Sequence, residues 1–96
     1  METPALRNDL NISYGFDLPE TTTIEALEAI LAERIDAMIN DDFNRLISLL
    51  YRVDVSETKL KQLLRENTAT NAGLLIARLI LERQWQKIET RRKFSR

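Results

Sequence analysis

Residues 72–88 read AGLLIARLILERQWQKI, and this stretch decides the fold class that the sequence predicts. Its first ten residues, 72–81, are apolar on nearly all sides of a helix, and Arg78 is the one charge among them. The apolar positions then thin to a single stripe flanked by cations. The pattern predicts one long helix from Ala72 to about Lys93, roughly 33 Å in length.

A helix that is apolar all round must be covered all round, and three shorter helices cannot shield its whole perimeter. We therefore expect a second polypeptide to cover this helix. That polypeptide is either another copy of the chain, giving a homodimer, or a different protein. The expected interface combines apolar positions of the helix with cations at a polar rim: Leu75, Ile76, Leu79, Ile80 and Trp85, with Arg83 and Lys87.

The middle of the chain predicts three shorter helices. Apolar residues recur at three- and four-residue steps after Thr22, which with Glu25 forms a capping-box pattern. Asn-Asp-Asp at residues 40–42 indicates an interruption, because these side chains compete for backbone hydrogen bonds. The nearly continuous apolar spacing also allows one unbroken helix there.

The second of these helices is expected over residues 43–53, and the third begins after Ser56, a good N-cap. Val55 and Leu60 are spaced for a hydrophobic staple at that start. The third helix is expected to end near Asn67. A short connection then leads to the long helix, which either Thr70 or Asn71 caps.

The N-terminal residues 1–20 show a different period. Leu10, Ile12, Tyr14, Phe16 and Leu18 alternate with polar residues or glycine, which predicts an extended arm lying in a groove. A disordered tail is the alternative. The expected organisation is thus an arm over residues 1–20 and a helical domain over residues 21–96. The expected fold is all-α, an irregular four-helix bundle with an extended N-terminal arm and a long C-terminal helix.

The amino-acid composition excludes several kinds of site chemistry. The 96 residues suit one domain, and the absence of Cys and His excludes disulfides, thiolate zinc sites and His-based catalytic dyads or triads. We therefore expect no enzyme and no cofactor, and oligomerisation is the remaining common way to stabilise so small a fold. No signal peptide or bilayer-long apolar run is evident, so a cytoplasmic protein without a membrane partner is expected.

Charge divides the chain into two halves. Residues 1–56 carry 11 acidic and 4 basic side chains, whereas residues 57–96 carry 4 acidic and 10 basic ones. The basic half, with Trp85 and Phe94, suggests nucleic-acid binding as the alternative function. Glu82 and Glu89 interrupt the basic tail and weaken a membrane-surface role. Pairing with the acidic half explains the same charges without any ligand.

Two acidic pairs, Glu25-x-x-Glu28 and Glu33-x-x-Asp36, are spaced to share a divalent cation on a helix. The pattern resembles the metal-binding signature of all-α nucleotide pyrophosphohydrolases. That family places its two pairs on different helices, whereas both pairs here fall on one helix. A solvated acidic face opposite the apolar stripe is therefore expected in place of a metal-dependent hydrolase.

Two segments resemble small bacterial proteins of unassigned function: residues 42–57, DFNRLISLLYRVDVSE, and residues 79–84, LILERQ. The resemblance covers roughly residues 24–94 and carries over no catalytic motif. It implies a bacterial, cytoplasmic, helical protein. Taken with the residues themselves, it leads us to expect a protein-interaction or oligomerisation module.

Overall fold

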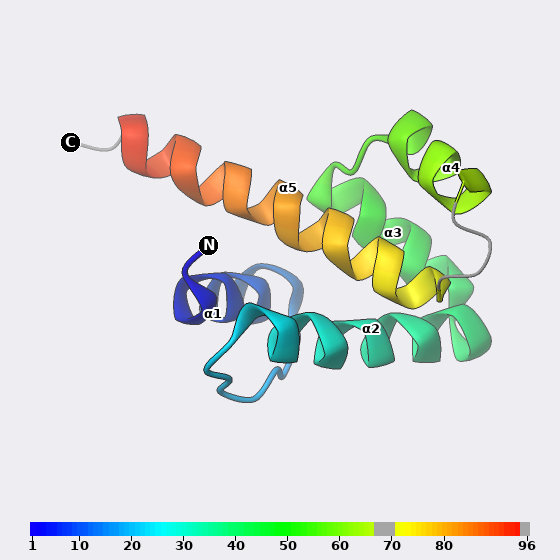
Figure 1. Cartoon of the computed structure of the whole chain (residues 1–96), viewed down its shortest axis with the longest axis horizontal. Coiled ribbons are helices and arrows are strands. Elements are labelled where there is room, and N and C mark those ends of the chain that lie inside the picture. Colours follow the sequence, from blue (N-terminus) through cyan, green and yellow to red (C-terminus); the bar gives the residue numbers. More distant parts are fainter. Residues whose placement is uncertain (67–70, 95–96) are drawn as a thin grey trace.

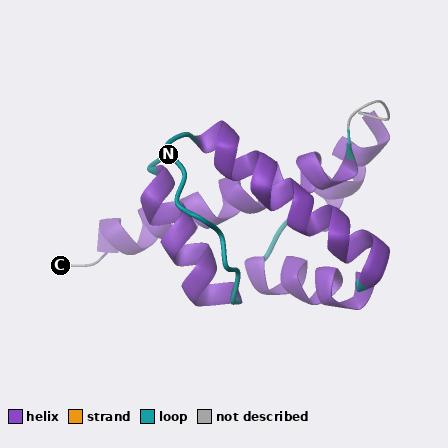
Figure 2. Ribbon diagram, turned by 90° about the horizontal axis from the view of Figure 1, so that it is seen from below, coloured by secondary structure: helices purple, strands orange, loops and turns teal. Residues whose placement is uncertain are grey.

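The computed structural model describes residues 1–66 and 71–94, and within those residues the chain is helical without strands (Figure 1, Figure 2). The helices are α1 (Thr3–Tyr14), α2 (Ile24–Asp41), α3 (Phe43–Val53), α4 (Glu57–Glu66) and α5 (Ala72–Phe94). The all-α expectation is confirmed. The expected count of four helices and an extended arm is corrected to five helices over the described residues.

Helix α1 occupies the segment for which the sequence predicted an extended arm, and that prediction is wrong. Pro4 stands in its first turn, and Gly15 ends it with a φ of 71° while its N–H bonds the Asn11 carbonyl oxygen. Proline suits a helix start and glycine a left-handed helix end. Leu6 and Leu10, four residues apart, are fully buried. The alternation seen from residue 10 to residue 18 therefore mixed the end of a helix with the loop after it.

The loop after α1 is tied back to that helix. The amide of Asn11 donates to the Leu18 carbonyl oxygen at 3.2 Å and accepts from the Leu18 N–H at 2.9 Å. Arg7 donates to the same carbonyl oxygen at 3.1 Å. Phe16 and Leu18 join the hydrophobic cluster that also contains residues of α2 and α5. Residues 1–20 thus belong to the common core and do not form a separate arm.

The predicted interruption between α2 and α3 is confirmed. Asp42 leaves helical geometry, and its carboxylate accepts a hydrogen bond from the Arg45 N–H at 3.2 Å. At the other end of α2 the N-cap is Thr23, whose hydroxyl accepts from the Ala26 N–H, one residue later than the predicted cap at Thr22. The two caps fix where α2 begins and where α3 turns away from it.

Helices α4 and α5 begin with the expected caps. Ser56 Oγ accepts from the Lys59 N–H and Asn71 Oδ1 from the Leu74 N–H, each at 3.2 Å. The predicted Asn67 end and the Thr70 cap lie outside the described residues. Helix α5 has 23 residues and packs on all four other helices, and its C-terminal turns extend beyond them (Figure 1).

Helix α2 lies close against the first turn of α5. A Cβ added at Gly73 would lie 2.9 Å from the Ala32 carbonyl oxygen and 2.1 Å from Asp36 Oδ1. Ala77, one turn further along α5, is fully buried. Small residues on α5 therefore allow α2 to lie close along it, and the Asp36 carboxylate lies at the positive end of the α5 dipole.

Candidate protein-contact surface

The apolar half of α5 is covered by its own chain. Leu75, Ile76, Leu79 and Ile80, four of the predicted interface residues, are between 0% and 6% exposed in a single copy. The helices that pack around α5 supply this cover. The physical reason for expecting a second polypeptide on this part of α5 therefore no longer holds.

The other three predicted interface residues are also engaged within the chain. Trp85 is partly buried against the core, with the Arg92 guanidinium 5.5 Å from its ring centre. Arg83 donates to the carbonyl oxygen of Asp54 and pairs with its carboxylate, both at 3.2 Å. Asp54 ends α3 with a positive φ of 68°. The contacts of Arg83 with Asp54 therefore hold the turn between α3 and α4 against α5.

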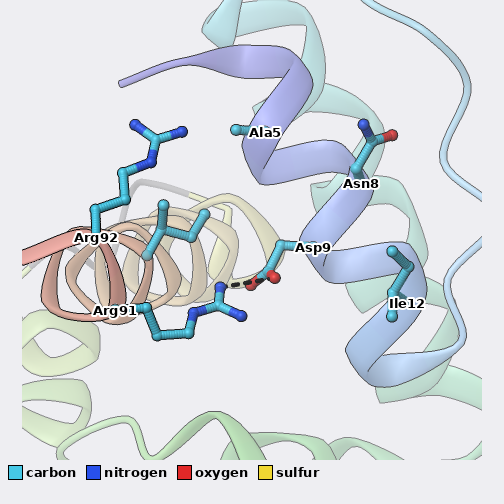
Figure 3. A pocket seen from close by; sticks show the side chains of 7 residues that line it. Ala5, Asn8, Asp9, Ile12, Arg91 and Arg92 are labelled. Carbon is cyan, nitrogen blue, oxygen red and sulfur yellow. Dashed lines mark hydrogen bonds and ion pairs between the residues drawn. The ribbon is translucent and has the colours of Figure 1, made fainter. Parts of the chain in front are cut away.

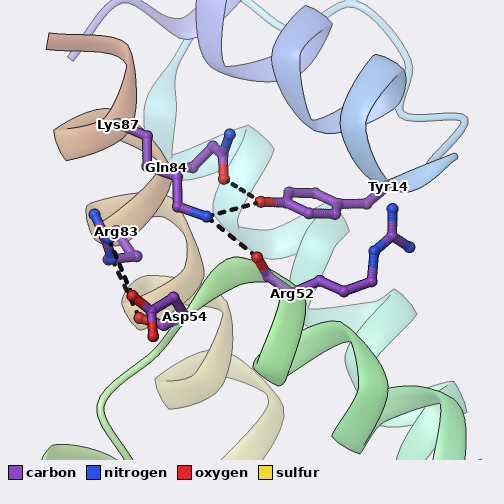
Figure 4. Close-up of polar contacts among 6 residues, drawn as sticks. All are labelled: Tyr14, Arg52, Asp54, Arg83, Gln84 and Lys87. Carbon is purple, nitrogen blue, oxygen red and sulfur yellow. Dashed lines mark hydrogen bonds and ion pairs between the residues drawn. The ribbon is translucent and has the colours of Figure 1, made fainter. Parts of the chain in front are cut away.

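Lys87 belongs to a polar network between α1, α3 and α5 that the sequence reasoning missed (Figure 4). Its ammonium group donates to Tyr14 Oη at 3.3 Å and to the Arg52 carbonyl oxygen at 3.2 Å. The Tyr14 hydroxyl donates to Gln84 Oε1 at 2.7 Å, and the Gln84 amide donates to Asp9. Gln84 is only 2% exposed, so these bonds satisfy polar atoms that lie out of reach of water.

An open hollow lies beside this network, between α1 and the C-terminal half of α5 (Figure 3). Asp9 Oδ1 accepts from Arg91 at 2.7 Å across it, and Arg92 lies at its edge. Ile12 lines the same hollow and is 84% exposed. The charged groups here already bond one another, and the hollow is open to solvent.

Four arginines of α5 are paired with acidic side chains of the acidic half of the chain. The pairs are Arg78 with Glu28, Arg83 with Asp54, Arg91 with Asp9, and Arg92 with Glu2. Each such exposed pair stabilises the fold only slightly, but together they neutralise the face that the nucleic-acid alternative requires. The arrangement favours internal charge pairing over phosphate binding.

One of these pairs shifts the titration of both members. The Arg92 guanidinium donates a hydrogen bond to the Glu2 carboxylate, which lowers the pKa of Glu2 below its ordinary value of 4.5. The same contact raises the pKa of Arg92. The pair is exposed and links the N-terminus to the last turns of α5.

The carboxylates of α2 that resembled a metal signature are used in other ways. Glu28 pairs with Arg78 at 3.0 Å, and Asp36 lies against Gly73. Within residues 1–66 and 71–94, no three acidic side chains are placed together as metal ligands. The acidic pairs of the sequence therefore do not converge on one point.

Helix α3 carries three large apolar side chains that the rest of the described chain leaves exposed. Phe43, Ile47 and Tyr51 follow one another at successive turns and are 56%, 50% and 87% exposed. The adjacent side of α3 is buried against α2 and α5 through Leu46, Leu49 and Val53. We call Phe43, Ile47 and Tyr51 the outer face of α3.

A sequence signal for the outer face of α3 exists. The 11 residues of α3 carry two apolar rows, 43–47–51 and 46–49–53, and the rows lie side by side around the helix. A short helix at the edge of a small domain buries one such row and exposes the other. The spacing alone does not say which of the two rows is buried.

None of the helices described over residues 1–66 and 71–94 is both long enough and apolar enough to cross a membrane. Comparison of the chain with protein-family models, curated proteins and solved structures finds no match. The resemblance of residues 42–57 and 79–84 to small bacterial proteins therefore stays an expectation.

Proposed function

We propose that this chain is a protein–protein interaction module and that the outer face of α3 is its contact surface. The partner is another copy of the chain or a second protein. The observation that carries the proposal is the row of Phe43, Ile47 and Tyr51, each half or more exposed on consecutive turns of one helix. A single exposed apolar residue is ordinary, but a contiguous row of large ones is typical of an interaction site.

The composition of the row supports this role. Phenylalanine and tyrosine are enriched in protein interfaces because they offer a large, rigid area with few rotatable bonds. Tyr51 also carries a hydroxyl group that suits the wet rim of an interface. Spacing of four residues places all three side chains on one side of the helix over about 12 Å, which suits contact with a helix or a shallow groove.

Contacts at both ends of α3 hold the outer face of α3 in a fixed position. Asp42 caps the start of α3, and Arg83 holds Asp54 at its end. The buried row Leu46, Leu49 and Val53 anchors the helix in the core. The outer face is therefore held in place before a partner arrives, which lowers the entropy cost of binding.

A photo-crosslinking amino acid in place of Tyr51, introduced in the source cell, tests the proposal. The matched control carries the same amino acid in place of Phe94, an aromatic residue that is 77% exposed at the end of α5. We expect discrete adducts from position 51, either of two chains or of the chain with another protein, and none of these from position 94. Adducts that do not differ between the two positions, or none from position 51, would contradict the proposal.

A further inference from the structure

We infer that the occupant of the outer face of α3 is a second copy of this chain, docked antiparallel about a two-fold axis at Ile47. The inference rests on the proposed contact role of this face and goes further by naming the partner and its register. Closed two-fold pairs are the commonest assemblies of identical chains, and they require a surface that is complementary to itself.

The order of residues along the outer face of α3 makes this surface complementary to itself. Reversing α3 about Ile47 sets Phe43 opposite Tyr51 of the second copy, and Ile47 opposite its own counterpart. An aromatic ring then meets an aromatic ring on each side of an aliphatic centre, an arrangement that favours offset or edge-to-face contacts. Antiparallel helices also place opposite dipole ends side by side.

Charge placement points the same way. In a two-fold pair, any charge near the axis faces its own copy and is repelled by it. Arg45 and Arg52 are the charged residues inside α3, and they lie about 160° and 140° around the helix from Ile47. Arg52 is also held against the end of α1, donating to the Ser13 carbonyl oxygen at 2.7 Å with its guanidinium 5.2 Å from the Tyr14 ring centre. The outer face therefore meets its copy without like-charge repulsion from α3.

The area of the face sets the expected strength of the pair. Two aromatic side chains and one isoleucine on each copy, exposed as observed, would bury roughly 800 Å² in total. Stable interfaces bury about 1,200 Å² or more, so the flanking residues must contribute and the pair is a weak one. We expect dissociation in the micromolar range, about the strength at which chain concentration controls assembly.

Single cysteines test both the partner and the register, since the chain has no cysteine of its own. Helix axes about 8–10 Å apart, with Cα atoms about 2.3 Å from each axis, leave facing Cα atoms about 3.4–5.4 Å apart. A disulfide spans this distance. Ile47→Cys should therefore form a covalent dimer in oxidised glutathione about tenfold faster than Ser48→Cys, an exposed neighbour on the same helix that points off the face.

The register is tested with two further variants. Phe43→Cys mixed with isotope-labelled Tyr51→Cys should give mainly the mixed dimer, because only these two positions face each other in an antiparallel pair. Dimers of 43 with 43 and of 51 with 51 would overturn the antiparallel register. Circular dichroism checks that each variant keeps the helical fold.

The outcomes also separate this inference from the proposed function. Equal, slow crosslinking of Ile47→Cys and Ser48→Cys would overturn self-pairing. If position 51 still gave discrete adducts with another protein in the cell, the contact role of α3 would stand and only its occupant would change. Failure of both experiments would remove the proposed function as well.

Discussion

Helix α5 has the longest apolar run of the chain and buries it, whereas α3 has a shorter run and leaves a row of it exposed. The difference in exposure follows from where each helix lies in the fold. Helix α5 packs on all four other helices, while α3 packs chiefly on α2 and α5 along one side. The comparison teaches that the number of neighbours around a helix, and not the hydrophobicity of its sequence alone, decides which apolar side chains remain available to a partner.

The largest expected difference is between two isoleucines, one on each helix. Ile80→Ala removes a fully buried side chain of α5 and should lower the free energy of unfolding by about 2–5 kcal/mol. Ile47→Ala shortens a half-exposed side chain of α3 and should stay within about 0.5 kcal/mol of the wild type in dilute solution. Urea unfolding followed by circular dichroism measures both. Similar losses of stability for the two variants would contradict the difference in burial between Ile80 on α5 and Ile47 on α3.

The close approach of α2 is part of the reason that α5 is covered. Gly73→Ala places a methyl group against the Ala32 carbonyl oxygen and should lower the free energy of unfolding by about 1–3 kcal/mol. Without that contact, alanine in a helix would be more stable than glycine, so the sign of the change is diagnostic.

Gly15 provides a control with a different cause. No atom lies within 4 Å of a Cβ added there, and only the positive φ opposes a side chain. Gly15→Ala should therefore cost about 1 kcal/mol, and Gly15→Asn less, since asparagine tolerates this conformation. Thermal or urea unfolding of the three variants gives the comparison; a Gly73→Ala protein more stable than the wild type would contradict the close approach.

A smaller effect is expected from removing one hydroxyl group. Tyr14→Phe breaks the bonds of the Tyr14 hydroxyl to Gln84 and Lys87 and should lower the free energy of unfolding by about 1–2 kcal/mol. Tyr51→Phe makes the same chemical change on the outer face of α3 and should have an effect below about 0.5 kcal/mol. Equal effects at both tyrosines, measured by urea unfolding, would show that the network does not bind α1 to α5 as described.

The smallest effect concerns the exposed pair of Glu2 and Arg92. The pKa of Glu2 is lowered in the folded chain, so the stabilisation from this pair is present above the ordinary pKa of 4.5 and is lost as the pH falls through the folded pKa. An NMR titration of the Glu2 carboxyl group should show its midpoint below 4.5, moving back toward 4.5 in Arg92→Gln and at high salt. An unchanged midpoint in Arg92→Gln would show that the pair does not form in solution.

Much of the helical framework could be predicted from the sequence. The break at Asp42, the caps at Ser56 and Asn71 and the extent of α5 all follow from local signals that act within a few residues. Helix α1 was missed because a period-two run overlapped its last turn. Pro4 and Gly15, which mark its two ends, were the better signal.

The contact surface could not be predicted in the same way. Which apolar row of α3 turns inward depends on where α2 and α5 lie, and that is a property of packing and not of local sequence. The cover of α5 was misjudged for the same reason, because it depends on how the other helices pack around α5. The ion pairs between the two halves, by contrast, agree with the charge division that the sequence displays.

Hydroxyl-radical footprinting of the wild-type chain at low and at high concentration tests the central comparison most directly. In dilute solution Phe43 and Tyr51 should be oxidised rapidly while Leu79 and Ile80 stay protected; on concentration Phe43 and Tyr51 should become protected, with Tyr14 as the unchanged internal control. Rapid oxidation of Leu79 and Ile80 in the dilute chain would contradict the burial of α5. Protection of Tyr51 that does not depend on concentration would contradict an outer face of α3 that is free in the single chain and covered on self-pairing.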